Sequence, residues 1–164
     1  MDLSPDTVLH DRYRIQRLLG SGGMGAVYLA FDQALEHPVA VKINQAVNPE
    51  SIAQFKNEAR LLATLRHPNL PRVSDYFIEG ENQFLVMDYI PGDDLKSRIM
   101  QYGPVPQDQV LRLAQQLGSA LSYLHHLDPP IIHRDVKPAN LKLSPEGEII
   151  LVDFGLANTA PADQ

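Results

Sequence analysis

The chain has 164 residues, of which 44% are hydrophobic and 21% charged, and its formal net charge at pH 7 is −6. Length and composition are those of a single globular domain, and they exclude a disordered tail, a collagen-like repeat and a coiled coil. The acidic balance makes the chain a poor general binder of nucleic acid or of an anionic membrane, although a local pocket can still hold one anion.

Cysteine is absent, which excludes a disulfide framework, a thiolate zinc site and a cysteine nucleophile, and fits a reducing compartment. The sequence contains no apolar run of roughly 18 residues, the length needed to span a bilayer. Residues 1–10 lack the basic and apolar regions of a secretory signal. We therefore expect a cytoplasmic protein with no membrane contact in this segment.

The first half of the chain is predicted to be rich in strands. Runs of strand-forming residues surround a glycine-rich turn, and others follow later, at 13–19, 26–31, 38–43, 73–78 and 83–89. A helix is predicted from Asn48, with Asn48 as N-cap and Pro49 at the first helical position. Its apolar face consists of Ile52, Phe55, Ala59, Leu62 and Leu65. His67-Pro68 ends it.

Pro91-Gly92 is the strongest candidate boundary, because a helical pattern follows it. Helices are predicted at 94–102 and 107–127, and short strands at 141–143 and 149–152, with a loop over 158–164. The longer helix has one apolar face, formed by Val110, Leu113, Leu117, Leu121 and Leu124.

Residues 20–25 read Gly-Ser-Gly-Gly-Met-Gly, which matches G-x-G-x-x-G. Glycines at this spacing let backbone N–H groups approach a polyphosphate, but the motif alone is equally consistent with a hairpin turn. A dinucleotide-binding loop requires a helix after the last glycine, whereas residues 26–31 have a strand pattern. A Walker A loop requires Gly-Lys-Ser/Thr, which is missing.

Three more motifs follow in order: Val-Ala-Val-Lys at 39–42, His-Arg-Asp-Val-Lys-Pro-Ala-Asn at 133–140, and Asp-Phe-Gly at 153–155. With the glycine loop, they resemble the protein-kinase signature set. The chain is similar to Ser/Thr protein kinases of the eukaryotic type found in bacteria, over residues 13–158. The Asp-Val-Lys-Pro stretch resembles Ser/Thr kinases rather than tyrosine kinases.

The resemblance implies an α+β, protein-kinase-like fold with a complete N-lobe, made of an antiparallel sheet plus one helix, and a partial helical C-lobe. The implied divisions are an N-terminal tail (1–12), the N-lobe (13–87), a hinge (88–91) and the partial C-lobe (92–164). The chain ends soon after Gly155, before the family's activation segment and remaining C-lobe helices. We therefore expect an N-terminal portion of a kinase domain.

ATP is the cofactor that the resemblance implies. The residues expected to bind it are Leu19, Gly20, Ser21, Gly22, Gly23, Met24, Gly25, Val27, Ala40, Lys42, Met87, Asp88, Ile90 and Asp94. Lys42 matches the lysine that contacts the α/β-phosphates, and Glu58 matches its ion-pair partner. The alternative for Glu58 is a solvated helix residue. The alternative for Asp94 is a solvated acid at a helix start.

The resemblance gives Asp135 the role of accepting or orienting the proton of the substrate hydroxyl, and Lys137 that of offsetting phosphoryl charge. Asn140 and Asp153 would hold Mg²⁺, which prefers oxygen ligands; the alternative for Asp153 is a cap at a strand end. His133 and Phe154 are structural in the family. His125 and His126 are adjacent on a helix and do not face each other, so they indicate a solvated helix end rather than a metal site.

One position departs from the family pattern. Lys142 stands where an apolar residue usually lies under the adenine ring, while Leu141 and Leu143 match. We favour a lysine whose stem covers the ring while its ammonium reaches solvent or an acid such as Asp94; the alternative is an ammonium on phosphate.

The expected function is ATP-dependent phosphorylation of Ser or Thr in substrate proteins, with no nucleic-acid partner. One alternative is an ATP-binding, pseudokinase-like regulatory fragment without phosphotransfer. Another is an interaction module that has lost nucleotide binding, which the joint presence of Lys42, Glu58, Asp135, Asn140 and Asp153 disfavours.

Overall fold

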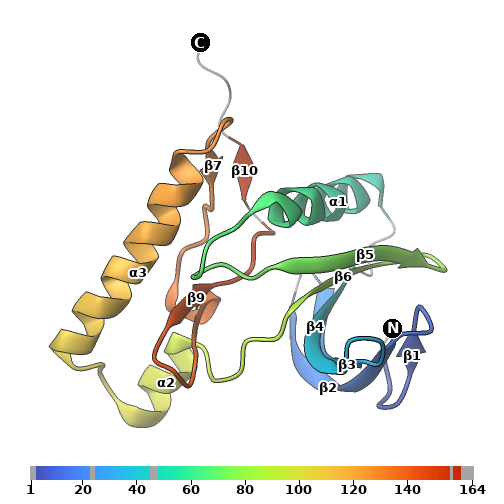
Figure 1. The fold of residues 1–164 in the computed structure, drawn as a ribbon, viewed down its shortest axis with the longest axis horizontal. Helices are drawn as coiled ribbons and strands as arrows, with labels where there is room; N and C mark the ends of the chain where they lie inside the picture. Colours follow the sequence, from blue (N-terminus) through green and yellow to red (C-terminus); the bar gives the residue numbers. More distant parts are fainter. Residues whose placement is uncertain (1–2, 23–24, 45–47, 156, 160–164) are drawn as a thin grey trace. The chain divides into compact units, whose positions relative to one another are not determined.

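The computed structural model describes residues 3–22, 25–44, 48–155 and 157–159 (Figure 1). The chain forms two compact units. The first unit comprises Met1–Thr64 and Arg72–Tyr89, and the second comprises Leu65–Pro71 and Ile90–Gln164.

The first unit is built on a six-stranded antiparallel sheet with the strand order β1-β2-β3-β4-β6-β5. Its strands are β1 (Val8–Leu9), β2 (Tyr13–Gly22), β3 (Gly25–Asp32), β4 (His37–Asn44), β5 (Val73–Glu79) and β6 (Asn82–Asp88). β2 and β3 are joined at the glycine motif, and β5 and β6 at a turn that contains Gly80. All five predicted strands thus pair with a sequence neighbour across a short connection, and two of these connections contain glycine.

Alternation along the strands gives the sheet two different faces. One face carries the apolar core, which consists of Tyr13, Ile15, Ala26, Tyr28, Ala30, Val39, Val41, Ile43, Phe77, Phe84 and Val86, together with Leu3 and Leu9. The opposite face carries Lys42, Asn44 and Gln83, which are also buried. Lys42, Asn44 and Gln83 therefore share one face of the sheet, opposite to the apolar core.

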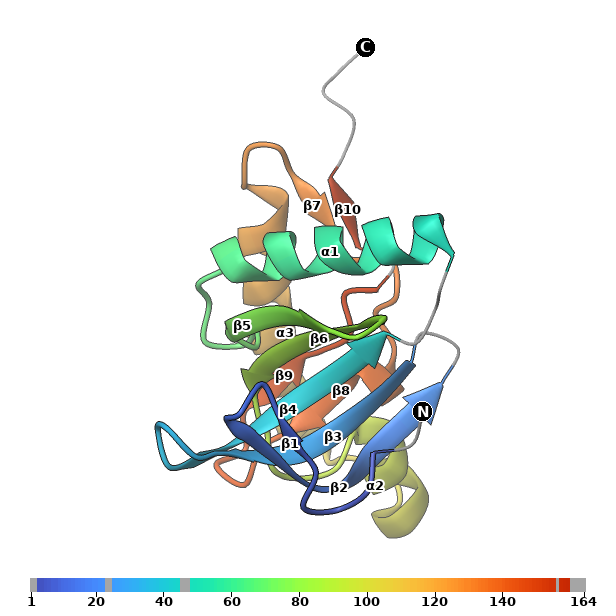
Figure 2. The same ribbon diagram turned by 90° about the vertical axis from the view of Figure 1, so that its right-hand side faces the viewer.

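Helix α1 (Pro49–Thr64) packs against β4, β5 and β6 and lies across the sheet in Figure 2. The predicted cap is confirmed, because the Asn48 side chain accepts a hydrogen bond from Ser51 N at 2.8 Å. Phe55, Ala59 and Leu62 are buried. The helix ends at Thr64, three residues earlier than the His67-Pro68 signal predicted.

The second unit contains the helices α2 (Leu95–Tyr102) and α3 (Gln107–His125) and the 3₁₀ turn η1 (Pro138–Asn140). Its strands form two antiparallel pairs: β7 (Ile131–Ile132) with β10 (Asn158–Thr159), and β8 (Leu141–Leu143) with β9 (Ile149–Leu151). Asn69 holds β9 in place, because its Nδ2 donates to Ile149 O and its carbonyl accepts from Leu151 N. This is why residues 65–71 belong to the second unit.

The largest differences from the prediction lie near the two ends of the described chain. No element was expected before residue 13, yet β1 pairs with β2, Leu3 and Leu9 are buried, and the His10 ring stacks on Phe77 with 4.7 Å between centroids. The loop predicted for 158–164 begins with β10 instead; residues 160–164 lie outside the described part. Both strands are only two residues long, too short for an alternating pattern to show in the sequence.

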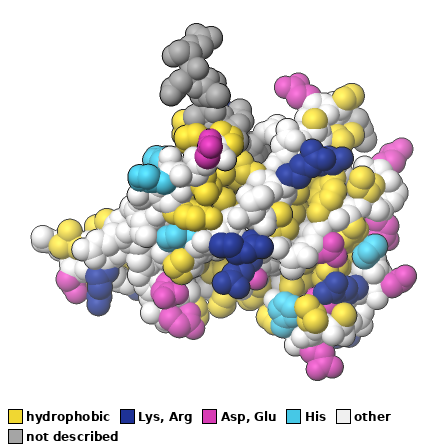
Figure 3. Space-filling view, turned by 45° about the horizontal axis from the view of Figure 1, so that its top comes forward, with side chains coloured by type: hydrophobic (Ala, Val, Ile, Leu, Met, Phe, Trp, Pro, Cys, Tyr) yellow, Lys and Arg dark blue, Asp and Glu magenta, His cyan; other side chains and the backbone are white. Residues whose placement is uncertain are grey.

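On the face shown in Figure 3, side chains of both charge signs are interspersed with apolar ones. Among the residues that the structure describes, none of the helices combines the length and apolarity that crossing a bilayer demands.

Candidate active site

The glycine motif closes the β2–β3 hairpin. Gly20 pairs with Val27, Ser21 with Ala26, and Gly22 with Gly25. A strand therefore follows the last glycine, as predicted, which excludes the dinucleotide-binding βαβ arrangement. Gly23 and Met24 lie outside the described residues.

Gly25 is the position in this hairpin where the backbone itself demands glycine. Its φ is +116°, and a Cβ placed there would lie 2.0 Å from the carbonyl oxygen of Ile43 on β4. At Gly20, by contrast, a Cβ would meet no atom within 4 Å. Gly25 is therefore needed for the close packing of β3 on β4, whereas Gly20 has room for a side chain.

Lys42 and Glu58 form a buried ion pair between β4 and α1. The Lys42 ammonium lies 2.7 Å from Glu58 Oε1 and 3.0 Å from Oε2. Both residues are buried, with 7% and 8% of their surface exposed. Glu58 is therefore not the solvated helix residue of the alternative interpretation. Either charge would be costly to bury without its partner. The short contacts between the two side chains therefore stabilise both of them inside the protein.

The apolar residues predicted to contact adenine lie on neighbouring strands of the same sheet face. Ala40 pairs with Leu29 on one side and Met87 on the other, and Val27 pairs with Lys42. Directly opposed residues of antiparallel strands point to the same side. Val27, Ala40 and Met87 therefore share the face that carries Lys42. Leu19 is exposed on β2.

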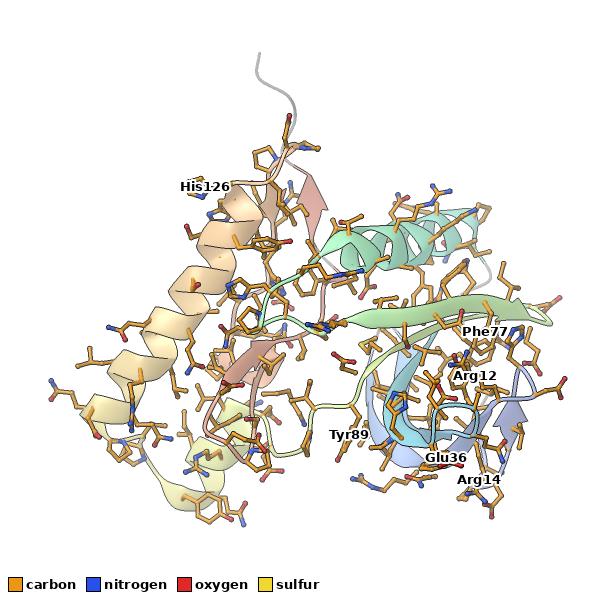
Figure 4. The ribbon with its side chains drawn as sticks, viewed as in Figure 1. Arg12, Arg14, Glu36, Phe77, Tyr89 and His126 are labelled. Atoms are coloured by element: carbon orange, nitrogen blue, oxygen red, sulfur yellow. The ribbon has the colours of Figure 1, made fainter. Side chains whose placement is uncertain are left out.

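The chain leaves the first unit at the end of β6, where Tyr89 is labelled in Figure 4. The backbone N–H of Asp88 donates to Arg72 O at 2.9 Å, and its carboxylate accepts from Arg72 N at 3.2 Å. Because the N–H of Asp88 is already bonded to Arg72, the predicted hydrogen bond between the Asp88 backbone and adenine concerns the carbonyl oxygen of Asp88. Ile90 is half-buried.

In the second unit, Asp94 is the N-cap of α2. Its carboxylate accepts from Ser97 N at 2.9 Å and from Ser97 Oγ at 2.6 Å. Burial raises the pKa of Asp94, but the hydrogen bonds from Ser97 and the charge of Lys142 outweigh it, so the net shift of this pKa is downward. Both observations favour an ionised, oriented carboxylate.

The Lys142 ammonium donates to the carbonyl oxygen of Gly92 at 2.5 Å. The strand β8 runs close by, because Leu143 N donates to Asp93 O and a Cβ on Gly92 would lie 2.3 Å from Leu143 O. Gly92 has a φ of +97°, so this approach also requires glycine. The lysine stem thus runs beside the segment that leads into α2, with its charge directed at that segment.

Asp135 is the centre of a hydrogen-bonded cluster between β7 and β8. Its Oδ2 accepts from Lys137 Nζ at 2.8 Å and from Asn140 Nδ2 at 2.9 Å, and Asn140 Nδ2 also lies 2.9 Å from the Asp135 carbonyl oxygen. The hydrogen bond from Lys137 is the main cause that lowers the pKa of Asp135, with Asn140 adding to it. The carboxylate is therefore ionised at neutral pH and fixed in direction.

Asp153 follows β9 in the left-handed region, with a φ of +64°. Its neighbourhood is tied to the Asp135 cluster, because Val152 N donates to Asn140 O at 2.9 Å. Strain of this kind in a non-glycine residue occurs preferentially at functional sites.

His133 is a buried side chain that contacts both Asp135 and Phe154. It is 1% exposed, its Nδ1 accepts from Asp135 N at 3.3 Å, and its ring meets Phe154 edge-on at 4.6 Å. Burial lowers the pKa of His133. A neutral, packed histidine of this kind fits the structural role predicted for it.

His125 and His126 are exposed at the end of α3, where Figure 4 labels His126. In the described part of the chain, no three His, Cys, Asp or Glu side chains come together as a metal-binding group.

Comparison with known proteins gives the family. A model of the protein kinase domain matches residues 13–164. The chain belongs to the protein kinase family. Its antiparallel-sheet unit with one helix and its helical second unit confirm the predicted α+β, kinase-like fold.

Bacterial Ser/Thr kinases are among the relatives. This confirms the prediction that the chain is a kinase domain of the eukaryotic type found in bacteria. Serine/threonine-protein kinase PknA of Mycobacterium tuberculosis is 38% identical over 162 residues, which cover 94% of this chain and 37% of the relative. Kinase pkn2 of Myxococcus xanthus is 39% identical, over 98% of this chain and 20% of the relative. Kinase PrkC of Bacillus subtilis is 38% identical, over 89% and 23%. The chain therefore spans between a fifth and two fifths of the length of these relatives.

The structure brings the predicted kinase residues together within each unit. Lys42 meets Glu58 in the first, and Asp135 meets Lys137 and Asn140 in the second. Sequence reasoning missed three polar side chains on the same sheet face as the ion pair: the buried Asn44 and Gln83 and the half-buried Tyr76. A polar residue at an inward-facing position of a strand was the signal available for Asn44, two residues after Lys42.

Proposed function

We propose that this protein transfers the γ-phosphoryl group of ATP to serine or threonine hydroxyls of substrate proteins. The observation that carries the proposal is the Asp135–Lys137–Asn140 cluster, in which one ionised carboxylate is fixed by an ammonium and an amide. The names of the relatives as Ser/Thr kinases support the same reaction.

Asp135 is suited to receive the proton of the attacking hydroxyl. Its Oδ2 accepts two hydrogen bonds, which leaves Oδ1 as the oxygen that would meet the substrate. As the new oxygen–phosphorus bond forms, the bond from the γ-phosphorus to the β-bridging oxygen breaks and ADP leaves. Lys137 is half-exposed and charged, so it can turn from Asp135 toward the transferred group and offset its negative charge.

Asn140 and Asp153 would hold Mg²⁺. The Asn140 amide donates through Nδ2, so its Oδ1 is the oxygen that remains for a cation, and Asp153 supplies a carboxylate. Magnesium held there would supply positive charge that offsets the negative charge developing on the transferred phosphoryl group. The oxygen donors of these two side chains suit magnesium, which prefers oxygen ligands.

The first unit supplies nucleotide-binding residues. The ammonium of Lys42 on β4 is hydrogen-bonded to Glu58, and it would contact the α/β-phosphates. Val27, Ala40 and Met87 give the same sheet face an apolar surface for the purine, beside Leu19 and the glycine motif. The backbone of Asp88 and Ile90 would bond the adenine edge, and Asp94 the ribose hydroxyls.

Phosphotransfer from labelled Mg·ATP to a protein substrate, followed by identification of the phosphorylated residue, tests this function. We expect Asp135→Ala to lower kcat by on the order of 10²–10⁴, the usual contribution of a positioned base. Glu146→Ala, in the exposed β8–β9 turn, is the matched loss of a carboxylate and should leave kcat within twofold. ATP binding without transfer by the wild-type protein, or an unchanged rate in Asp135→Ala, would contradict the proposal.

A further inference from the structure

A chain of polar side chains, two of them buried and one half-buried, joins the sheet to helix α1. Asn44 Nδ2 donates to Gln83 Oε1 at 3.1 Å and to the backbone carbonyl of Ser51 at 3.2 Å, and Gln83 Nε2 donates to the Tyr76 hydroxyl at 2.7 Å. We call Asn44, Gln83 and Tyr76 the polar bridge. Asn44 and Gln83 are 5% and 4% exposed.

The polar bridge occupies the same sheet face as the Lys42–Glu58 pair. Asn44 lies two residues beyond Lys42 on β4 and is paired directly with Gln83 on β6. Ser51 lies in the first turn of α1, and Glu58 lies two turns further along the same helix. The bridge and the ion pair thus attach α1 to β4 at two separate points.

Phe55, which lies between Ser51 and Glu58 along α1, packs beside both Tyr76 and Lys42. The Phe55 ring lies 6.4 Å from the Tyr76 ring, and the Lys42 ammonium lies 6.0 Å from the Phe55 centroid. Tyr76 in turn accepts the hydrogen bond from Gln83. A movement of α1 away from Asn44 would therefore also displace Phe55, which packs next to Lys42.

We propose that Asn44 and Gln83 are positioning residues, which fix the first turn of α1 so that Glu58 reaches Lys42. The inference rests on the proposed kinase function and adds to it the device that sets the ion pair. Apolar packing alone tolerates sliding of a helix over a sheet, because it has no preferred direction. A hydrogen bond to one backbone carbonyl specifies a single placement, and breaking it leaves buried polar groups unpaired.

The absence of cysteine from the sequence allows a direct measurement of the helix position. Nitroxide labels at Lys56→Cys on α1 and Leu35→Cys in the β3–β4 turn, both exposed, report the distance between helix and sheet by double electron–electron resonance. In the protein with the polar bridge intact, we expect one narrow distance distribution. In Asn44→Leu/Gln83→Leu, we expect a broader or shifted one.

The double variant separates positioning from stability. Replacing both partners of a buried hydrogen bond with apolar residues of similar size can be nearly neutral for stability, whereas a single replacement leaves one group unpaired. Asn44→Leu/Gln83→Leu should therefore remain folded but lack the bond to Ser51. We expect its kcat to fall about 10- to 100-fold, as misplacement of a catalytic group by about 1 Å does, with the KM for ATP changed less.

Tyr76→Phe is the matched control, because it removes the outer end of the polar bridge and leaves Asn44 bonded to Ser51. Its label distances and kcat should stay close to those of the wild type. Should the double variant fail to fold, Asn44→Ser makes the same measurement, since its short side chain no longer reaches Ser51 but leaves room for a water beside Gln83.

A narrow, unshifted distance and a wild-type kcat in a folded Asn44→Leu/Gln83→Leu or Asn44→Ser variant would overturn the inference. The distance measurement does not depend on catalysis. If the wild-type protein transfers no phosphate, the proposed function fails while the label distances still decide whether the polar bridge positions α1.

Discussion

The Lys142 side chain shows how one charged residue can occupy a position that the family pattern leaves apolar. Its ammonium is bound to the Gly92 carbonyl, 2.5 Å away, and its charge also lowers the pKa of Asp94. This hydrogen bond of the ammonium is thus to a backbone carbonyl rather than to the expected acid, and coverage of the adenine ring by the lysine stem stays a prediction. The hydrogen bond also ties β8 to the segment before α2, a consequence that the sequence pattern did not reveal.

Asp32 is a buried carboxylate held by four hydrogen bonds. It is 2% exposed and accepts two hydrogen bonds from Arg12, both at 2.8 Å, and two from the backbone N–H groups of Ala34 and Leu35. The Arg12 guanidinium is the main cause that lowers the pKa of Asp32 from 3.8 to about 2. Asp32 thereby joins the N-terminal segment to the β3–β4 turn.

Asp32→Asn should lower the free energy of unfolding by about 2 kcal/mol at pH 7, because each unit of pKa shift corresponds to about 1.4 kcal/mol. A lowered folded-state pKa stabilises the protein above the unfolded pKa of 3.8, and this contribution is lost as the pH falls toward 2. Urea unfolding at pH 7, 5 and 3 measures it. The difference between wild type and variant should shrink at pH 3.

Glu36→Gln is the control for that series, since Glu36 is an exposed carboxylate in the same turn (Figure 4). Its effect should stay within about 0.5 kcal/mol at each pH. A difference between Asp32→Asn and wild type that does not change with pH would show that the Arg12 ion pair is not the source of the stabilisation.

At the scale of elements, the β2–β3 hairpin combines a predicted ligand-binding motif with a packing requirement. The Gly25 backbone approaches Ile43 O on β4, the strand that also carries Lys42. The position of the glycine turn relative to Lys42 is therefore set partly by the absence of a side chain at residue 25.

We expect Gly25→Ala to destabilise the first unit by at least about 2 kcal/mol, because the new Cβ would collide with backbone and because its φ of +116° is unfavourable for alanine. Gly20→Ala is the matched change in the same motif, and it should cost under about 0.5 kcal/mol since its Cβ would enter open space. Chemical denaturation of both variants makes the comparison. Equal losses would show that strand packing at Gly25 is not the determinant.

The elements that could be predicted from the sequence have strong local signals. Asn48-Pro49 marked the start of α1, and the turn around Gly80 marked the β5–β6 hairpin. The resemblance to the kinase family implied that Lys42 and Glu58 would pair, and the structure contains this pair. The polar bridge could not be predicted, because Asn44 and Gln83 are 39 residues apart and meet only through the pairing of β4 with β6. Long-range register of this kind has no local signal.

At the scale of the whole molecule, α3 leaves more apolar surface exposed than its sequence pattern suggested. Leu113 and Leu124 are buried, whereas Val110 is 46% exposed and the neighbouring Leu111 is 58% exposed. Leu117 and Leu121 are half-buried. Apolar side chains that cluster on one helix and remain in water favour association with another surface.

An isolated polypeptide of residues 1–164 should therefore be marginally stable and prone to self-association. Each large apolar side chain left in water forfeits roughly 1.5–3 kcal/mol, against a total stability of about 5–15 kcal/mol for an ordinary domain. Circular-dichroism melting and light scattering over a concentration series measure both properties. Val110→Gln/Leu111→Gln should reduce association, and Gln115→Ala, a change at an exposed polar position of the same helix, should not. A monodisperse monomer with a cooperative melt well above room temperature would contradict this expectation.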